Sequence, residues 1–232
     1  MQICGLQKLA MVDYPGKLAA TVFTGGCNLR CPFCHNALLV TQLAENPERH
    51  SVEEVLAFLK SRKGLLDGVV LSGGEPLLQP DAADFLSAVK AMGYAVKLDT
   101  NGCYPAALRE ILERGLVDYV AMDIKNSRER YAETVGLPAF DLSPVEESIR
   151  LLRESGVDYE FRTTIVKEFH TEADIHSIGR WVGGAPRYYL QNFVDSGNLI
   201  AGGLNPVEPL RLQAFAEIAK DYFSDVQLRG VD

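Results

Sequence analysis

Short apolar runs alternate along the chain with longer segments in which apolar residues recur at helical spacing. The short runs are rich in β-branched and aromatic residues and predict strands, while the longer segments predict amphipathic helices. We expect strands at Ala19–Thr24, Gly68–Ser72, Tyr94–Asp99, Val117–Ile124, Tyr159–Val166 and Arg187–Gln191, with a short tail strand near Val226–Leu228. We expect helices at Ser51–Arg62, Asp81–Met92, Pro105–Arg114, Ser143–Glu154, Glu172–Val182 and Pro209–Phe223. Ser51 and Glu54 have the spacing of a capping box.

This alternation predicts an α/β fold of six βα units. Strands that are apolar on both faces indicate a parallel sheet covered by helices. Six units are too few for a closed eight-stranded barrel, so an open sheet and an incomplete barrel both remain possible. Polar or glycine-rich residues follow most of the predicted strands, and the carboxyl ends of parallel strands share one rim. Loops that are distant in sequence should therefore meet at one site.

Composition limits the possible classes of protein. The 232 residues suffice for one sizeable domain, and 47% hydrophobic with 23% charged residues is ordinary for a globular protein. The net charge of −8 argues against nucleic acid as a partner. No apolar run has the length of a membrane span, and residues 1–10 lack the pattern of a signal peptide. We therefore expect a cytoplasmic protein with no membrane or nucleic-acid partner.

Three of the five cysteines, Cys27, Cys31 and Cys34, fall within one short segment. The odd count disfavours a disulfide framework, and the clustering predicts a metal or an iron–sulfur cluster. Three thiolates on one tight loop can each bind one iron of a 4Fe-4S cluster and leave the fourth iron open to an external chelate. Cys4 and Cys103 are isolated, which predicts lone thiols and no auxiliary cluster.

The alternative is a zinc-stabilised binding protein in which the three cysteines and His35 hold the metal. Structural zinc sites usually divide their four ligands into two separated pairs. Here all four candidates crowd into one loop, with His35 directly after Cys34. The spacing therefore favours the cluster.

The spacing Cys-x3-Cys-x2-Cys, with Phe33 before the last cysteine, resembles the signature of the radical S-adenosylmethionine (SAM) superfamily. The resemblance implies an incomplete (β/α)6 barrel of parallel strands with outer helices. It also implies a single core domain over 1–232, with an N-terminal extension at 1–17 and a C-terminal helix and tail at 204–232. In this superfamily the open iron binds the amino and carboxylate groups of SAM, and one electron from the cluster breaks a sulfur–carbon bond.

Further motifs strengthen the resemblance. Gly73–Pro76 resembles the family's GGE motif, Asp99–Gly102 resembles the DTNG segment of glycyl-radical-enzyme activases, and Asp123–Lys125 resembles their D-x-K segment. The resemblance implies a SAM site formed by Phe33, His35, Gly73, Gly74, Glu75, Asp99, Asp123, Lys125, Arg162 and Gln191. It also implies a monovalent cation bound by Asp99, Thr100, the carbonyl of Ala121 and Asp123. The residues alone leave open whether Arg162 faces a ligand or a peptide substrate, or forms a structural ion pair.

The segments Val12–Lys17, Thr24–Cys27 and Leu228–Gly230 resemble activating proteins of anaerobic ribonucleoside-triphosphate reductase. This resemblance implies that a deoxyadenosyl radical abstracts an α-hydrogen from a glycine of a partner enzyme, with flavodoxin or ferredoxin as electron donor. Pyruvate formate-lyase activases carry a histidine near the end of the sixth strand, where this chain has Gln191 and Asn192. Activation of that enzyme, or of another glycyl radical enzyme, is the alternative. A second alternative is a small-molecule substrate, which a cavity closed by the tail 204–232 would favour.

Overall fold

The structure of the protein, a computed structural model, describes residues 1–195 and 197–230. One sheet contains every named strand, in the order in which the strands follow along the chain. Its strands are β1 (Ile3–Ala10), β2 (Ala19–Thr24), β3 (Gly68–Gly73), β4 (Ala95–Thr100), β5 (Tyr119–Asp123), β6 (Asp158–Ile165), β7 (Tyr188–Asn192) and β8 (Val226–Arg229). Strands β2 to β8 are parallel, whereas β1 pairs antiparallel with β2.

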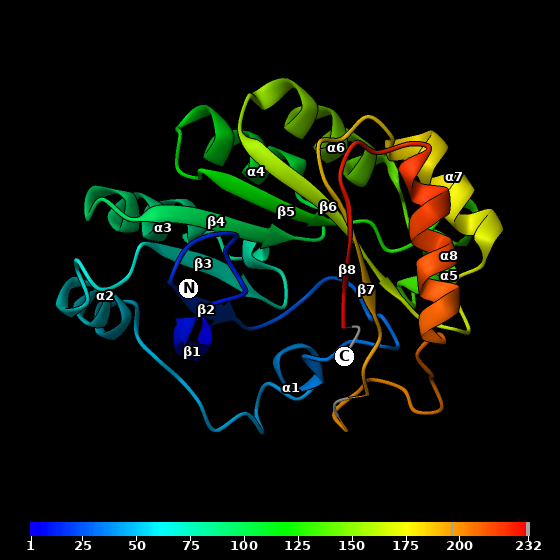
Figure 1. Cartoon of the computed structure of the whole chain (residues 1–232). Helices are drawn as coiled ribbons and strands as arrows, with labels where there is room; N and C mark the ends of the chain where they lie inside the picture. The colour runs from blue at the N-terminus through cyan, green and yellow to red at the C-terminus, as the bar shows by residue number, and fades with distance from the viewer. Residues whose placement is uncertain (196, 231–232) are drawn as a thin grey trace.

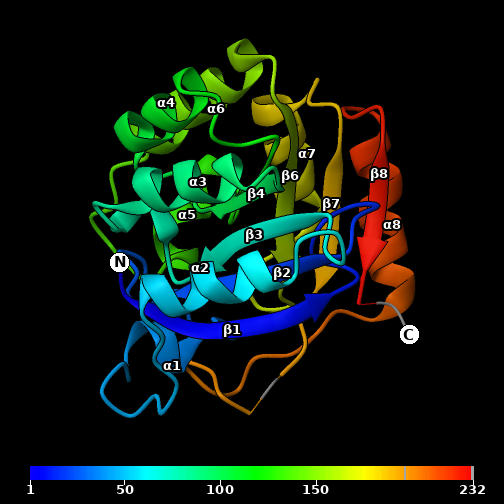
Figure 2. The ribbon, with the colours of Figure 1, turned by 90° about the vertical axis from the view of Figure 1, so that its left-hand side faces the viewer.

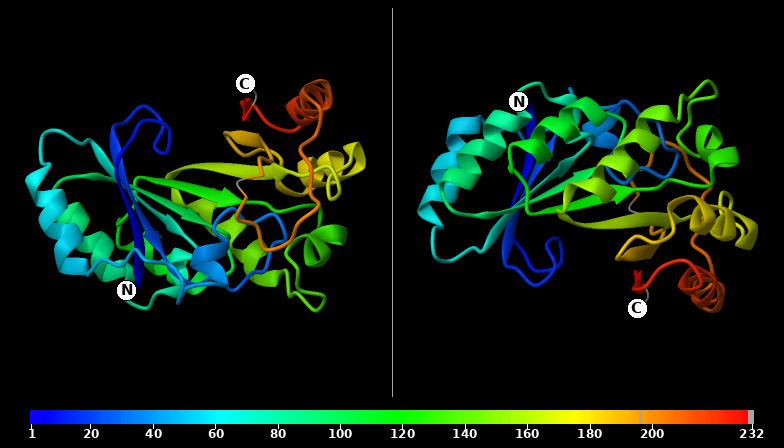
Figure 3. Two further views of the ribbon diagram at one scale, coloured as in Figure 1. Left: turned by 90° about the horizontal axis from the view of Figure 1, so that it is seen from below. Right: turned by 90° about the horizontal axis from the view of Figure 1, so that it is seen from above.

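Helices connect successive strands and cover the outer face of the curved sheet (Figures 1 and 2). The α-helices are α1 (Ala37–Val40), α2 (Val52–Ser61), α3 (Ala82–Ala91), α4 (Pro105–Glu113), α5 (Tyr131–Thr134), α6 (Ser143–Ser155), α7 (Glu172–Val182) and α8 (Pro209–Lys220). Two short 3-10 helices, η1 (Pro76–Leu78) and η2 (Arg128–Arg130), lie in the loops after β3 and β5. Views from below and above show the sheet curling so that one face is turned inward (Figure 3).

The two faces of the sheet bury different chemistry. On β4, Val96 and Leu98 belong to the large apolar core that the helices cover, and both are fully buried. The intervening Lys97 and Asp99 form an ion pair and therefore share the inner face. A small apolar cluster that includes Tyr14, Val70 and Tyr119 fills another part of the interior. Strand alternation thus places Val96 and Leu98 outward, under the helices, while the inner face carries both the ion pair and the small apolar cluster.

The six predicted βα units and the tail strand are confirmed, and the sheet is an incomplete barrel of parallel strands with outer helices. The Ser51 hydroxyl accepts a hydrogen bond from the backbone N–H of Glu54, and the backbone N–H of Ser51 donates to the Glu54 carboxylate, so the predicted capping box is present. Strand β1 was not predicted, because its middle residues are exposed and its apolar pattern is weak. It lies within the stretch 1–17 that the sequence assigns to an N-terminal extension. Among the described residues, no helix combines the length and apolar character that a membrane span requires.

Candidate functional site

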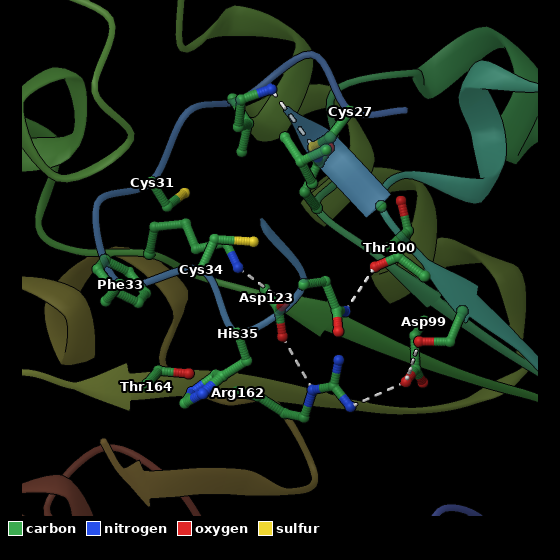
Figure 4. A pocket seen from close by; sticks show the side chains of 18 of the residues that line it. Cys27, Cys31, Phe33, Cys34, His35, Asp99, Thr100, Asp123, Arg162 and Thr164 are labelled. Atoms are coloured by element: carbon green, nitrogen blue, oxygen red, sulfur yellow. Dashed lines mark hydrogen bonds and ion pairs between the residues drawn. The ribbon is translucent and has the colours of Figure 1, made fainter. Parts of the chain in front are cut away.

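A cavity of about 240 Å³ lies at the carboxyl ends of the parallel strands (Figure 4). The loops after β2, β3 and β4 contribute to its wall, as do the ends of β5, β6 and β7. It is lined by Cys27, Leu29, Cys31, Phe33, Cys34, His35, Asn36, Val40, Ser72, Gly73, Gly74, Asp99, Thr100, Asn101, Asp123, Lys125, Arg162, Thr164 and Gln191. The strand-end residues that are distant in sequence therefore meet at one site, as expected.

Hydrogen bonds within the cysteine loop and to its neighbours hold the loop in place. Gly26, with φ +86°, turns the chain away from β2 and donates its N–H to the carbonyl of Leu39 at 2.7 Å. The Arg30 guanidinium donates to the carbonyl of Cys27 at 2.7 Å. The backbone N–H of Cys34 donates to the carbonyl of Cys31 at 3.0 Å, which forms a turn between the two cysteines. The positions of the cysteines are thus set by the turn between Cys31 and Cys34 and by hydrogen bonds to Leu39 and Arg30.

The three thiols are free and surround the same space (Figure 4). Burial raises the pKa of Cys27 to about 11 and that of Cys31 to about 12, so both are protonated until a metal displaces the proton. Among the described residues, no group of three His, Cys, Asp or Glu side chains is arranged to hold a single metal ion. Three thiols that line one cavity suit a cluster with one open iron. His35 lines the same cavity, so analysis of the bound metal is what separates this cluster from the zinc alternative.

His35 and Phe33 both line the cavity. The His35 ring packs against Phe193 with ring centroids 5.6 Å apart, and burial together with nearby Lys125 lowers the pKa of His35. Phe33 is 3% exposed and lies 6.0 Å from the ring of Phe169. Both residues are therefore held by aromatic neighbours, at positions that a bound ligand can reach.

The loop after β3 packs against the cysteine loop through backbone hydrogen bonds. Gly74 donates its N–H to the carbonyl of Thr24 at 2.9 Å, and Glu75 donates its N–H to the carbonyl of Gly26 at 2.8 Å. A Cβ atom on Gly74 would lie 2.0 Å from that same carbonyl oxygen. Asn36 donates its side-chain amide to the carbonyl of Gly73 at 3.0 Å. Glycine is required here because the two backbones approach too closely for a side chain.

The carboxylate of Glu75 does not line the cavity and is fully buried. It accepts hydrogen bonds from the N–H of Leu77 at 3.0 Å, the N–H of Asn101 at 2.7 Å and the hydroxyl of Thr100 at 2.8 Å. Burial raises the pKa of Glu75 to about 7, against the opposing effect of these hydrogen bonds. Its side chain therefore joins the loops after β3 and β4.

Opposite charges alternate on the inner wall. Arg162 donates to Asp123 at 2.9 Å and to Asp99 at 3.3 Å, so its guanidinium bridges the two carboxylates (Figure 4). Lys125 pairs with Asp123 at 2.8 Å, and Lys97 pairs with Asp99. Burial alone would raise the pKa of both aspartates, but Arg162 and the two lysines outweigh burial and hold both pKa values below the ordinary range. The charged residues that line the cavity are thus two cations, Arg162 and Lys125, and two carboxylates, Asp99 and Asp123. The two cations carry N–H donors of the kind that bind a ligand carboxylate.

The expected ligands of the monovalent cation are only partly brought together. Asp99, Thr100 and Asp123 line the cavity, whereas Ala121 is fully buried within β5 and does not. Asp99 and Asp123 already have cationic partners. The cation remains a prediction, and binding it would require rearrangement of these ion pairs.

The cavity also contains residues that sequence reasoning did not assign to it. Ser72 donates its hydroxyl to Asp99 at 3.1 Å, and Asn101 places its amide 3.7 Å from the sulfur of Cys27. Thr164 lies two residues after Arg162 on β6, so both side chains are on the inner face. Strand alternation could therefore have identified Thr164 as a cavity residue. Cys4 and Cys103 do not line the cavity.

The sequence profile of the Radical SAM superfamily matches residues 21–182. A protein of Methanocaldococcus jannaschii, named as a candidate glycyl-radical enzyme activating enzyme, is 33% identical over 99% of this chain and 96% of its own length. A pyruvate formate-lyase-activating enzyme of Clostridium pasteurianum is 36% identical over 54% of this chain and 52% of its own length.

Solved structures share the fold at low sequence identity. Streptococcus suis SuiB bound to S-adenosylmethionine superposes with a TM-score of 0.71 at 16% identity, covering 89% of this chain and 49% of SuiB. A domain of a pyruvate-formate lyase-activating enzyme from Bacteroides vulgatus superposes with a TM-score of 0.58 at 19% identity, covering 70% of this chain and 99% of that domain. At these identities the likeness concerns the fold alone.

Proposed function

The chain belongs to the radical SAM superfamily, and we propose that it is an activase that generates a glycyl radical on anaerobic ribonucleoside-triphosphate reductase. The observation that carries the proposal is a cavity lined by three free thiols, by Gly73 and Gly74 of the loop after β3, and by the cations Arg162 and Lys125. The similarity to the Methanocaldococcus protein, which extends over nearly the whole of both chains, supports an activase.

In this proposal Cys27, Cys31 and Cys34 hold a 4Fe-4S cluster. When bound, the cluster supplies one electron that cleaves SAM and yields a deoxyadenosyl radical. Cys31 is buried and Leu29 and Phe33, which line the same part of the cavity, are also buried, which would limit the access of water to the cluster. The amide of Asn101, 3.7 Å from the sulfur of Cys27, provides a hydrogen bond to that ligand.

The remaining cavity residues bind and orient SAM. Arg162 and Lys125, which line the cavity, would donate to its carboxylate, and the backbone of Gly73 and Gly74 would contact its amino group. Phe33 lies where the adenine is expected. Glu75 acts indirectly, since its three hydrogen bonds fix the loops that carry these groups.

The position of the tail favours a protein substrate. Residues 204–230 contribute nothing to the lining of the cavity, so the described part of the tail does not enclose it. Because β1 and β8 are the first and last strands in the order of the sheet, the barrel also lacks a closing strand pair. A small substrate needs enclosure, whereas a polypeptide segment needs access from one side.

The proposed electron donor is flavodoxin or ferredoxin, because the reaction needs one electron for each SAM cleaved. In the proposed reaction, the deoxyadenosyl radical would take the α-hydrogen from a glycine of the partner and so become deoxyadenosine. The partner retains the unpaired electron on its glycine. Methionine and deoxyadenosine are released.

The test is an anaerobic incubation of the reconstituted protein with SAM, a reductant and the anaerobic ribonucleotide reductase from the same organism. We expect a glycyl radical doublet in the electron paramagnetic resonance spectrum and one deoxyadenosine per radical formed. SAM cleavage without any radical on the reductase would exclude this partner. Parallel incubation with pyruvate formate-lyase tests the alternative partner.

A further inference from the structure

A second polar cluster lies on the inner face of the barrel, beyond the cavity. Glu160 on β6 is fully buried and does not line the cavity. It accepts a hydrogen bond from the hydroxyl of Tyr119 at 2.6 Å on one carboxylate oxygen. Its other oxygen has a single cationic contact, 3.4 Å from Nη1 of Arg229. The proposed SAM and cluster sites use neither Glu160 nor Arg229.

Arg229 lies where the last strand of the sheet meets the cavity. It is the last residue of β8 and is opposite Gln191 of β7 in the register, and Gln191 lines the cavity. The guanidinium carbon of Arg229 is 3.7 Å from the centroid of the Tyr189 ring. This stacking fixes the plane of the guanidinium before any ligand arrives. The side chain is 31% exposed, so part of it faces solvent.

Within the part of the chain that the structure describes, most of the hydrogen-bonding capacity of Arg229 is unused. A guanidinium carries five N–H donors, and within 1–195 and 197–230 the side chain donates only to Glu160, at 3.4 Å. That distance is long for a charge-assisted hydrogen bond, which is usually about 2.7–2.9 Å. A single N–H group would suffice to neutralise Glu160, whereas the partly exposed guanidinium of Arg229 offers several more donors. The arrangement suits acceptor oxygens approaching from outside the sheet.

We propose that Arg229 is a specificity-determining residue that binds acceptor oxygens on the glycine-bearing segment of the partner enzyme. The inference rests on the proposed function, which supplies the polypeptide substrate. Glu160 and Tyr189 position the guanidinium, and its free N–H groups bind main-chain carbonyl oxygens as the segment passes β8 toward the cavity. Arg229 thereby contributes to the affinity for the partner, while the reacting groups lie deeper.

The experiment measures radical formation against the concentration of the reductase for wild type, Arg229→Gln and Arg229→Lys. We expect Arg229→Gln to raise KM for the reductase at least about tenfold, as loss of a charged hydrogen-bonding group at an interface does. The rate at saturating reductase should stay within about threefold of wild type. Arg229→Lys keeps a charge beside Glu160 but loses the planar fork, so its KM should be intermediate.

The matched control is Gln227→Ala on the same strand, because Gln227 is exposed and its side chain donates only to Asp225 among the described residues. Direct binding of the cluster-loaded variants to the reductase, by anaerobic calorimetry, gives a second readout. If Arg229→Gln does not fold, Arg229→Lys decides the question. A KM and affinity within twofold of wild type, or an equal fall in the saturated rate, would overturn the inference. If wild type neither binds nor activates the reductase, the proposed function fails and the inference fails with it.

Discussion

At the scale of single residues, the polar groups in and around the cavity differ in how many hydrogen bonds and ion pairs the protein itself supplies to them. Asp99 and Asp123 each have cationic partners, and the Glu75 carboxylate has three donors. The thiol of Cys31 is buried and that of Cys27 is half-buried, and neither sulfur forms an ion pair in the part of the chain that the structure describes. Thiols of one loop that line the same cavity can each become a thiolate ligand when a metal displaces the proton.

Replacing any one of Cys27, Cys31 and Cys34 by alanine should abolish iron retention and SAM cleavage. The loss should exceed the ~10–100-fold that removal of an outer hydrogen bond to a metal ligand costs. Iron content and deoxyadenosine release, both measured anaerobically, check this. Cys4→Ala is the matched control, since Cys4 is 2% exposed on β1 and does not line the cavity. Full cleavage activity in any of the three variants would contradict the assignment.

Glu75 should make stability depend on pH. Its folded-state pKa of about 7 lies above the ordinary 4.5, so the folded protein keeps a proton that the unfolded chain releases. The resulting stabilisation is complete below about pH 4.5 and is lost as pH rises through 7, by up to about 3 kcal/mol. Glu75→Gln cannot titrate and should remove this part of the pH dependence.

Urea unfolding of the cluster-free protein between pH 5 and pH 8 measures the effect. The difference between wild type and Glu75→Gln isolates Glu75 from the histidines that titrate in the same range. Glu53→Gln on the exposed face of α2 is the control and should follow wild type. Coincident curves for wild type and Glu75→Gln would show that Glu75 does not titrate in this range.

Sequence reasoning found much of the cavity because chemistry-bearing residues directly follow predicted strands. The positions of Asp99, Asp123 and Arg162 at strand ends were sufficient to bring them together. The direction of the Glu75 side chain, which points away from the cavity and accepts a hydrogen bond from Thr100, was not predictable. It depends on how the loop after β4 packs, and the sequence pattern does not encode this packing. For the same reason the ion pairs that occupy the expected cation ligands were not predictable.

At the scale of elements, the site depends on close contact between two loops. The carbonyl of Gly26 accepts the N–H of Glu75 at 2.8 Å, which brings the loop after β3 against the cysteine loop. A contact between two backbones tolerates no intervening side chain. Strands β2 and β3 are adjacent and parallel, so the two loops leave the sheet side by side.

Gly74→Ala should separate these loops. The added Cβ would lie 2.0 Å from the carbonyl oxygen of Gly26, and no rotamer relieves a clash with backbone. We expect a loss of stability of at least ~1–3 kcal/mol and faster release of iron to a chelator. Gly202→Ala is the control, because nothing lies within 4 Å of its Cβ position. A melting temperature and an iron release rate equal to those of wild type would contradict the packing described here.

The helices and parallel strands were predictable because each carries its own periodicity. The antiparallel β1 was missed because its stability comes from pairing with β2, a contact that its sequence pattern does not encode. The short helices α1 and α5 were likewise missed, since a single turn has too few residues for a period to emerge.

At the scale of the whole molecule, one apolar core runs from Ile3 on β1 to Phe223 after α8. All strands belong to a single sheet, and each one contacts its neighbours in chain order. The N-terminal stretch 1–17 and the tail from 204 both contribute strands to this sheet. We therefore propose a single folding domain rather than a core with loosely attached ends.

Cooperative unfolding tests this proposal. Scanning calorimetry of the cluster-free protein in an oxygen-free buffer should give one transition, with a calorimetric enthalpy equal to the van't Hoff enthalpy. The physical reason is that the large apolar core joins residues of β1, of the parallel strands and of α8. Two resolved transitions would indicate that the tail or the N-terminal stretch unfolds independently.

The central claim is that three cysteines hold a cluster whose remaining iron is open to SAM. Electron paramagnetic resonance of the anaerobically reconstituted, reduced protein tests it most directly, with spectra recorded before and after SAM is added. The predicted result is a 4Fe-4S signal from wild type that changes on addition of SAM and is absent in Cys31→Ala. Protein that contains zinc in place of iron, or a cluster signal that SAM leaves unchanged, would contradict it.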